Sequence, residues 1–338
     1  MQAIAVVDAG LKDIELPMPQ AQGRDLLVRV EAISVNPVDY KMRVGAASDR
    51  TEGKPAPVLG WDVAGVVTAV GPDASLFKPG DQVYYAGSIV RPGANSEFHL
   101  VDERIAARKP ATLGFAQAAA LPLTSITAWE ALFARLGIDR SGADAGKRLL
   151  IVGGAGGVGS IAIQLATRLA GLTVVATASR PASAEWVRKL GAQHVIDHSG
   201  DMPAQLKALG MDDVDFILCL NDFDQHAAAL AAAIAPQGKI CSIVRHEGGP
   251  LALDVLFSKS VTLVFEMMFT RSMFGTADMI EQHRLLTEVA GLVDQGVLQT
   301  TLGESFGAIN AANVARAHAA LEGGRTIGKI VLTGFGAA

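Results

Sequence analysis

A glycine-rich hexapeptide in the middle of the chain restricts the possible folds more than any other segment. Residues 154–159 read Gly-Ala-Gly-Gly-Val-Gly and fit the pattern G-x-G-x-x-G. An apolar stretch that predicts a strand, residues 149–152, precedes the hexapeptide, and a predicted helix, residues 158–170, follows it. In this context the first glycine allows a tight turn, the second lets a pyrophosphate approach the backbone, and the third lets helix and strand pack closely. The hexapeptide therefore predicts a dinucleotide-binding loop, with a purely structural glycine turn as the alternative.

The end of the next predicted strand indicates which dinucleotide is bound. Loops that bind NAD usually have Asp or Glu about 20 residues further on, where the carboxylate binds the ribose 2′-hydroxyl. Here the strand 173–178 ends in Ser179 and Arg180, with no acid. A hydroxyl and a guanidinium suit a 2′-phosphate, because charge-assisted hydrogen bonds are strong. We therefore expect NADPH, although Arg180 that only covers the surface is the alternative. The residues expected at this cofactor are Gly154, Ala155, Gly156, Gly157, Val158, Gly159, Ser179 and Arg180.

The 338 residues are enough for two domains. The first part of the chain is rich in short predicted strands and turn signals, as in a barrel-like module. From residue 124 strands and helices alternate, which is typical of a parallel sheet. The predicted fold class is α/β, with a Rossmann doubly wound parallel sheet and a β-rich domain. The later elements expected are strands at 173–178, 194–196, 214–220, 239–244, 261–265 and 329–332 and helices at 185–190, 224–235, 277–294 and 310–322.

Composition excludes several classes of protein. The chain has 29 Lys and Arg against 34 Asp and Glu, a formal net charge of −5, and no basic run, so a nucleic-acid partner is not expected. Cys219 and Cys241 lie in separate apolar stretches, which excludes a disulfide scaffold. The N-terminal residues lack the features of a secretory signal, and glycines interrupt the apolar residues 149–167, so we expect a cytoplasmic protein without a membrane span.

Several motifs spread over nearly the whole chain resemble those of the medium-chain dehydrogenase/reductase superfamily. Within it, the chain is similar to the zeta-crystallin-like quinone oxidoreductases and to the zinc-lacking branch of zinc-type alcohol dehydrogenase-like proteins. The resemblance rests on the glycine loop and on the segments NPVDYK (36–41), GWDVAGVV (60–67), KPGDQV (78–83), LTSITAWEAL (123–132), LGA (190–192) and GKIVL (328–332).

This resemblance implies a GroES-like catalytic domain over residues 1–123, a Rossmann NADP-binding domain over 124–265, and a C-terminal segment, 266–338, that completes the catalytic domain. It implies a homodimer formed through the nucleotide-binding domains. It also implies that Thr127 approaches the nicotinamide end of the cofactor and that Lys329 contacts a cofactor phosphate.

The zinc branch of the superfamily would place its catalytic metal ligands where this chain has Asn36, Trp61 and Leu123. None of these is an ordinary zinc ligand, because zinc sites use Cys, His and carboxylates. The seven histidines are scattered and show no metal-binding spacing. We therefore expect no metal, and expect acceptors that stabilise an incoming hydride themselves, namely quinones and α,β-unsaturated carbonyls.

Three residues near the start of the chain are the candidate catalytic groups. Tyr40 and Asn36 are possible donors to the oxyanion that develops on the acceptor, and Asp39 could orient its neighbours or the ribose hydroxyls. Each has a structural alternative: Asn36 as a turn cap before Pro37, Asp39 as a helix cap, and Tyr40 as a core residue.

Two other functions stay open. The chain could be a zinc-dependent alcohol dehydrogenase, or a non-catalytic NADPH-binding structural or sensor protein. A short-chain reductase is excluded, because none of the three tyrosines is followed by lysine at the fourth position. The predicted function is NADPH-dependent reduction of a small quinone or enone.

Overall fold

The computed structural model describes residues 1–8, 10–48 and 56–335. The chain forms two compact units. Unit 1 contains Met1–Ile126 and Phe269–Ala338, and unit 2 contains Thr127–Met268. The division therefore falls at Thr127 rather than at residue 124, and at Phe269 rather than at residue 266. Each unit is described by itself.

Unit 2 is built on a six-stranded parallel sheet with the order β10-β9-β8-β11-β12-β13. The chain thus starts in the centre, builds outward on one side, and returns to build the other side, which is the order of a Rossmann doubly wound sheet. The strands are β8 (Arg148–Val152), β9 (Thr173–Thr177), β10 (His194–Ile196), β11 (Val214–Cys219), β12 (Ile234–Ser242) and β13 (Thr262–Phe265).

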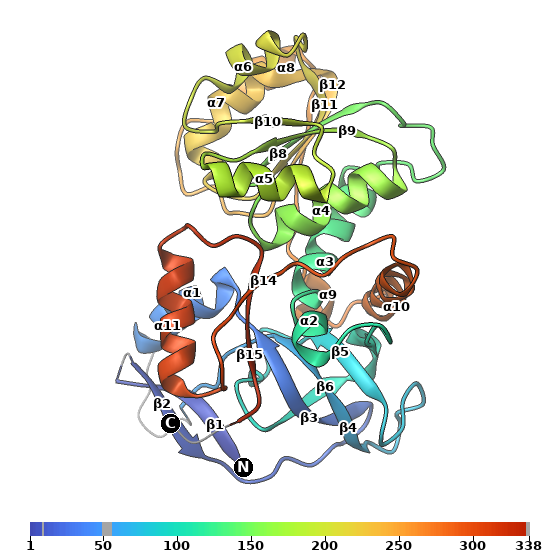
Figure 1. Ribbon diagram of the computed structural model, residues 1–338, viewed down its shortest axis with the longest axis vertical. Coiled ribbons are helices and arrows are strands. Elements are labelled where there is room, and N and C mark those ends of the chain that lie inside the picture. The colour runs from blue at the N-terminus through green and yellow to red at the C-terminus, as the bar shows by residue number, and fades with distance from the viewer. Residues whose placement is uncertain (9, 49–55, 336–338) are drawn as a thin grey trace. The chain divides into compact units, whose positions relative to one another are not determined.

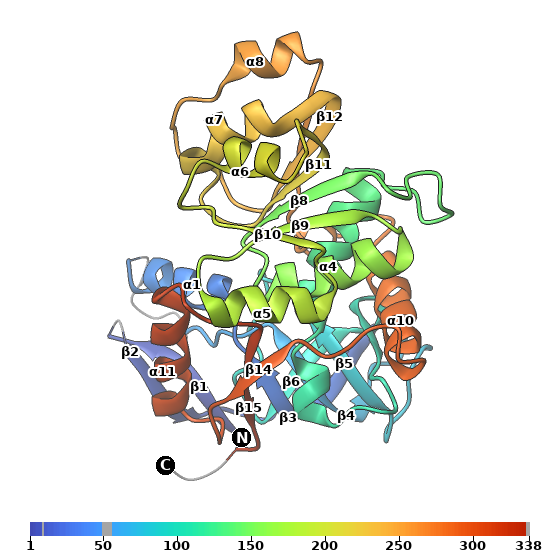
Figure 2. The same ribbon diagram turned by 45° about the horizontal axis from the view of Figure 1, so that its top comes forward.

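Helices cover both faces of this sheet, as both views show (Figures 1 and 2). The helices α4 and α5 lie on one face and α6 and α7 on the other. Alternate strand residues, among them Leu150 and Ile217, pack with Leu206 and Leu230 of α6 and α7 into one apolar core. The helices are α4 (Gly157–Leu169), α5 (Pro181–Leu190), α6 (Met202–Ala208), α7 (Phe223–Ala233) and α8 (Leu253–Ser258), and a π-helical turn spans Glu130–Arg135.

Unit 1 is mainly β-structure. Its larger sheet has the order β14-β15-β3-β4-β5-β7, and β6 also pairs with β3. The strands are β3 (Asp25–Ser34), β4 (Asp62–Val70), β5 (Gln82–Ala86), β6 (Phe98–Asp102), β7 (Ala106–Arg108), β14 (Leu302–Ser305) and β15 (Lys329–Thr333), and a separate pair is β1 (Gln2–Val7) with β2 (Gly10–Glu15).

The C-terminal part of the chain completes unit 1, because β15 lies antiparallel beside β3. Helix α11 packs against α1 near the smaller sheet, red beside blue in Figure 1. The helices are α1 (Pro37–Ser48), α2 (Phe115–Ala119), α9 (Thr270–Phe274), α10 (Glu281–Asp294) and α11 (Ala311–Glu322); α3 (Pro122–Trp129) contains the division between the units, and Glu103–Ile105 form a 3-10 turn.

The predicted α/β fold class is confirmed, and most predicted elements differ from the observed ones only at their ends. Two differences have a local cause. Helix α10 begins at Glu281 rather than residue 277, because Asp278 accepts hydrogen bonds from Thr276 (2.6 Å) and Arg271 (3.0 Å) and holds the preceding residues in a turn. Strand β12 begins at Ile234 rather than residue 239, and a bulge with left-handed Gln237 (φ +63°) follows.

No helix in the described part of the chain is long and apolar enough to cross a membrane. Both cysteines, Cys219 and Cys241, are buried and free, as their apolar surroundings predicted.

Candidate functional site

The glycine loop of unit 2 follows β8 and leads into α4. Gly153 has a φ of +86°, which a glycine adopts without strain. A Cβ on Gly159 would lie 2.5 Å from the carbonyl oxygen of Gly154, so only glycine lets the helix start so close to the loop. A Cβ on Gly154 would lie 2.8 Å from that of Ala176 in β9. The backbone of this loop therefore depends on the absence of side chains.

Gly156 differs from these positions. It is the residue before the first turn of α4, and a Cβ there would meet only the Gly153 carbonyl oxygen, at 3.6 Å. The fold of the unit therefore does not require glycine at this position. Open space beside backbone N–H groups at a helix N-terminus is what an approaching phosphate needs. The residues present thus fit a dinucleotide.

Neighbouring side chains hold the loop in place. The N–H of Gly153 donates to the Thr177 hydroxyl at 2.9 Å, at the end of β9. The Ser160 hydroxyl donates to the Gly156 carbonyl oxygen at 2.7 Å and accepts from Trp186 Nε1 at 2.8 Å. The loop is therefore fixed before any ligand binds, which lowers the entropic cost of binding.

The two residues expected to select NADPH directly follow the strand that touches the loop. Ser179 is exposed, and Arg180 is half-buried at the residue before α5. Both come just after Thr177, whose carbonyl oxygen accepts from the N–H of Gly154 at 3.2 Å. The structure therefore brings the predicted Ser179 and Arg180 to the carboxyl end of the sheet beside the loop. Thr127, the other cofactor residue predicted in this unit, is buried in α3.

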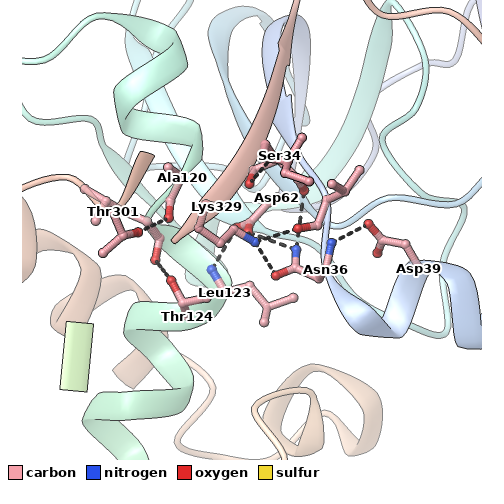
Figure 3. A network of polar contacts seen from close by, with 12 residues as sticks. Ser34, Asn36, Asp39, Asp62, Ala120, Leu123, Thr124, Thr301 and Lys329 are labelled. Atoms are coloured by element: carbon pink, nitrogen blue, oxygen red, sulfur yellow. Dashed lines mark hydrogen bonds and ion pairs between the residues drawn. The ribbon is translucent and has the colours of Figure 1, made fainter. Parts of the chain in front are cut away.

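Unit 1 contains a buried polar network of a different kind, shown in Figure 3. Through Oδ2, Asp62, the first residue of β4, accepts from the Asn36 side-chain amide at 2.9 Å and forms an ion pair with the Lys329 ammonium at 3.0 Å. Its Oδ1 accepts from the backbone N–H of Leu123 at 2.8 Å. Lys329 also donates to the Val35 carbonyl oxygen at 2.9 Å and to Asn36 Oδ1. The network joins four segments of the chain.

Asn36 has no amide hydrogen left for a ligand. Its Nδ2 donates to Asp62 and, at 3.3 Å, to the Ser34 carbonyl oxygen, while its Oδ1 accepts from Lys329. Because an amide nitrogen carries two hydrogens, both are used inside unit 1.

Asp39 is completely buried in the first turn of α1. Its Oδ2 accepts from the backbone N–H of Asn36 at 2.9 Å, so it does cap the start of the helix. Its Oδ1 has no hydrogen-bond partner among the described residues. Burial raises the pKa of Asp39 to about 7, although the Asn36 N–H and the charge of Lys329 lower it. Asp39 therefore has one buried carboxyl oxygen that the described residues leave without a partner.

Tyr40 is half-buried and faces different neighbours from Asp39. Partial burial, followed by the charge of Glu322 in α11, raises its pKa above the ordinary value. Glu322 is paired with Arg43 at 2.7 Å. The structure therefore joins Asn36 and Asp39 directly, whereas Tyr40 lies next to them in sequence and is influenced by α11.

The side chains at the three positions where a zinc enzyme would have its metal ligands do not fit a metal ion. Asn36 is bound as described, Trp61 Nε1 donates to the Ser88 carbonyl oxygen at 3.1 Å, and Leu123 contributes only its backbone N–H. Within residues 1–8, 10–48 and 56–335, no group of three or more His, Cys, Asp or Glu could hold a metal ion. We therefore assign no step to a zinc ion.

Sequence reasoning missed Asp62 and the partners of Lys329 within unit 1. Lys329 is only 3% exposed, donates to the Val35 carbonyl oxygen and to Asn36 Oδ1, and is paired with Asp62. Its expected contact with a cofactor phosphate stays a prediction. The available signal was the position of Asp62 inside the motif at 60–67, next to Trp61.

Comparisons with known proteins agree with both units. The alcohol dehydrogenase GroES-like domain matches residues 22–124, and the zinc-binding dehydrogenase domain matches residues 190–332. The chain is 42% identical over 323 residues to a zinc-type alcohol dehydrogenase-like protein, SAS2087, of Staphylococcus aureus (strain MSSA476), which covers 95% of this chain and 94% of the relative. It is 37% identical over 211 residues to the 2-methylene-furan-3-one reductase of Solanum lycopersicum, covering 59% of this chain and 52% of that enzyme.

Solved structures are also similar over the whole chain. A candidate zinc-dependent alcohol dehydrogenase protein from Rhizobium etli CFN 42 has 52% identity and a TM-score of 0.94, with 100% of this chain and 99% of that chain covered. Mycobacterial Rv1454c complexed with NADPH has 28% identity and a TM-score of 0.83, and the quinone oxidoreductase of Pseudomonas syringae pv. Tomato DC3000 has 26% identity and a TM-score of 0.81. Both cover 98% of this chain and 99% of their own.

Proposed function

Because the chain belongs to the medium-chain dehydrogenase/reductase superfamily and is an oxidoreductase of that type, we propose that it reduces a quinone or an α,β-unsaturated carbonyl with NADPH and without zinc. One observation carries this proposal. The side chains at Asn36, Trp61 and Leu123, where a zinc enzyme of this superfamily needs metal ligands, are an amide, an indole and an isobutyl group, and the two polar ones are bound inside unit 1. Acceptors that need no Lewis acid then fit best.

Unit 2 would hold the cofactor. The N–H groups at the start of α4 would bind the pyrophosphate, and Gly156 leaves room for it. Ser179 and Arg180 would bind the 2′-phosphate, and Thr127 the nicotinamide end. The bound nicotinamide supplies a hydride to the acceptor. NADPH in the Rv1454c structure supports the choice of cofactor.

Unit 1 would supply the polar groups for the acceptor. Negative charge develops on the acceptor oxygen, and a positioned donor lowers the barrier. Asn36 has no free amide hydrogen, so we assign the donor role to the Tyr40 hydroxyl. Asp39 Oδ1 would accept a hydrogen bond from a ligand hydroxyl. The tomato 2-methylene-furan-3-one reductase and the P. syringae quinone oxidoreductase support an enone or a quinone as the acceptor class.

The experiment that tests the function follows NADPH absorbance with a panel of quinones, enones and aldehydes, alongside elemental analysis of the purified protein. We expect turnover with quinones or enones and no stoichiometric zinc. One tightly bound zinc per chain, with activity lost on chelation, would establish a zinc alcohol dehydrogenase instead. Tight NADPH binding without turnover of any acceptor would establish a binding protein.

The Tyr40→Phe variant tests the donor, because it removes only the hydroxyl. Losing a positioned oxyanion donor typically lowers turnover by about 10²–10³. We expect an enone to be affected more than a quinone, since a quinone delocalises the charge into an aromatic ring. A variant that keeps more than half of its turnover on both acceptors, at unchanged stability, rules Tyr40 out.

We also propose that the protein is a homodimer formed through unit 2. Strand β13 is an edge of the sheet, and it and α8 expose large apolar side chains. Phe257 is 87% exposed, Leu253 58% and Phe265 53%. Exposed edges and apolar patches of this kind usually mark an interface. Light scattering should give twice the chain mass, and Phe257→Asp should shift the protein to monomer.

A further inference from the structure

The ammonium of Lys329 is a buried cation surrounded by oxygen partners of unit 1. Lys329 is the first residue of β15 and is 3% exposed. Its Nζ donates to the Val35 carbonyl oxygen at 2.9 Å and to Asn36 Oδ1, and it forms an ion pair with Asp62 Oδ2 at 3.0 Å (Figure 3). The ammonium is therefore held by three oxygen atoms of unit 1, one of which carries the opposite charge.

We propose that Lys329 is a positioning residue: its ammonium fixes Asn36 and Asp62, and through them the first turn of α1, which carries Asp39 and Tyr40. The proposal rests on the function proposed above. It gives Lys329 a role that differs from the contact with a cofactor phosphate expected from the sequence.

The charges decide how the Asn36 amide is oriented. In the observed orientation Oδ1 faces the ammonium of Lys329, and Nδ2 faces the carboxylate of Asp62. Rotating the amide by 180° would place Nδ2 against the ammonium and Oδ1 against the carboxylate, and both contacts would be repulsive. Without the ammonium, only the weaker preference set by Asp62 remains.

The Asn36 backbone, whose position depends on where its side chain is held, contacts Asp39 directly. The backbone N–H of Asn36 donates to Asp39 Oδ2 at 2.9 Å, and the N–H of Asp39 donates to the Asn36 carbonyl oxygen at 2.9 Å. Asp39 Oδ1, which has no hydrogen-bond partner in the described part of the chain, therefore points where this reciprocal pair places it. A displacement of about 1 Å at a catalytic group can cost on the order of 10²-fold in rate.

Asp62 connects the ammonium of Lys329 to the start of α3. Its Oδ1 accepts from the N–H of Leu123 at the start of that helix. When a substitution removes the ammonium of Lys329, the Asp62 carboxylate keeps two neutral donors but has no counter-charge in the network. We therefore expect the side chains to rearrange mainly around residues 36, 62 and 123 when this counter-charge is lost.

The two possible roles of Lys329 predict different kinetics. A phosphate contact contributes binding energy, so losing it weakens NADPH binding and leaves turnover at saturation unchanged. A positioning residue in unit 1 acts on the acceptor side. Losing it lowers kcat and leaves the Kd of NADPH unchanged.

The experiment compares Lys329→Met, the double variant Lys329→Met with Asp62→Asn, and a control, Arg24→Met. Arg24 is paired with the buried carboxylate of Glu103 at 2.7 Å elsewhere in unit 1, so the control also removes the partner of a buried acid. For each protein, kcat with a saturating enone, the Kd of NADPH by fluorescence, and Tm are measured. The double variant removes both charges and should recover Tm.

We expect kcat to fall by about 10- to 100-fold in both Lys329 variants, with the Kd of NADPH within twofold. The control should lose Tm but keep kcat. A Kd that rises more than tenfold with kcat unchanged would assign Lys329 to the cofactor phosphate. Recovery of kcat together with Tm in the double variant would make Lys329 merely structural. Both results overturn the proposal and leave the proposed function intact, whereas a wild-type protein without turnover overturns both.

Discussion

The two units build their candidate sites from different parts of the polypeptide. In unit 2 the glycine loop is made of backbone atoms within one short segment, and side chains are excluded from it: a Cβ on Gly159 would lie 2.5 Å from a carbonyl oxygen. In unit 1 the network around Lys329 consists mostly of side chains, and its members come from β15, β4, the start of α1 and the start of α3.

This difference separates two kinds of sensitivity. A backbone site fails when an atom is added, because close packing leaves no room. A buried charged network fails when an atom is removed, because a charge is left without its partner. We therefore expect substitutions that add atoms to the glycine loop to destabilise unit 2. Substitutions that remove a charged group from the buried network should destabilise unit 1.

The largest effect should follow the addition of one methyl group to the loop. In Gly159→Ala the new Cβ meets two backbone carbonyl oxygens, at 2.5 Å and 2.6 Å, so we expect a loss of at least about 4 kcal/mol of stability. Tm and far-UV circular dichroism measure it. Gly156→Ala is the matched control, because its Cβ has room; its stability should change by less than about 0.5 kcal/mol while NADPH affinity falls. A Gly156→Ala protein that binds NADPH like wild type would show that no phosphate approaches there.

The second-largest effect should follow the removal of one carboxylate from the buried network of unit 1. Asp62→Ala leaves the Lys329 ammonium buried without a carboxylate, and breaking such a pair typically costs about 3–5 kcal/mol. Urea unfolding measures it. Lys12→Ala removes an exposed ion pair to Asp8 and should change stability by no more than about 1 kcal/mol. Equal losses in the two variants would mean that the buried network contributes no more than a surface pair.

A pH series extends the comparison, because Asp39 in unit 1 and Glu266 in unit 2 are both buried carboxyl groups with a raised pKa. Burial raises the pKa of Asp39 from 3.8 to about 7. In unit 2, burial and the nearby Glu130 raise the pKa of Glu266 from 4.5 to about 8, against the effect of Arg135. The folded state then binds the proton more tightly, so stability is fully present below the unfolded pKa and falls as pH rises to the folded one.

We therefore expect Asp39→Asn to gain stability relative to wild type between pH 4 and 7, on the order of 3 kcal/mol in total, and nothing more above pH 7. For Glu266→Gln the gain should continue to about pH 8. Tm across pH 4–9 is the measurement. A difference from wild type that does not vary with pH would show that these carboxyl groups titrate normally.

The smallest effect concerns the end of β9, where we expect side chains of unit 2 to select between NADPH and NADH. The proposed contact of Arg180 with the 2′-phosphate is a charge-assisted hydrogen bond that would contribute roughly 1.5–3 kcal/mol, so Arg180→Ala should weaken NADPH binding by about 10- to 100-fold and leave NADH nearly unchanged. Titration with both cofactors measures it. Equal affinity of the wild-type protein for NADPH and NADH would remove the basis for the NADPH assignment.

The same difference explains what could be predicted from the sequence. The glycine loop is contiguous, and its flanking apolar residues fix its context, so the parallel sheet and the start of α4 follow from the pattern alone. The partners of Lys329 cannot be predicted from such a local pattern. They depend on β15 lying beside β3, and on Asp62 beginning the strand on the other side of β3, and both pairings are non-local. The sequence offered Asn36 as a donor to the acceptor oxyanion or as a turn cap, and only the structure shows that both of its amide hydrogens are used.

The pairing of β15 with β3 also sets an order of events during synthesis. The Ser34 hydroxyl donates to the Ile330 carbonyl oxygen across 296 residues of sequence. On the ribosome all of unit 2 is translated before residue 329 emerges, so unit 2 can fold while the larger sheet of unit 1 still lacks a strand and Asp62 lacks its cation. Assembly therefore ends with a long-range and slow step. Until then, the side of β3 that will receive β15 is an open strand edge that a chaperone or a second nascent chain can bind.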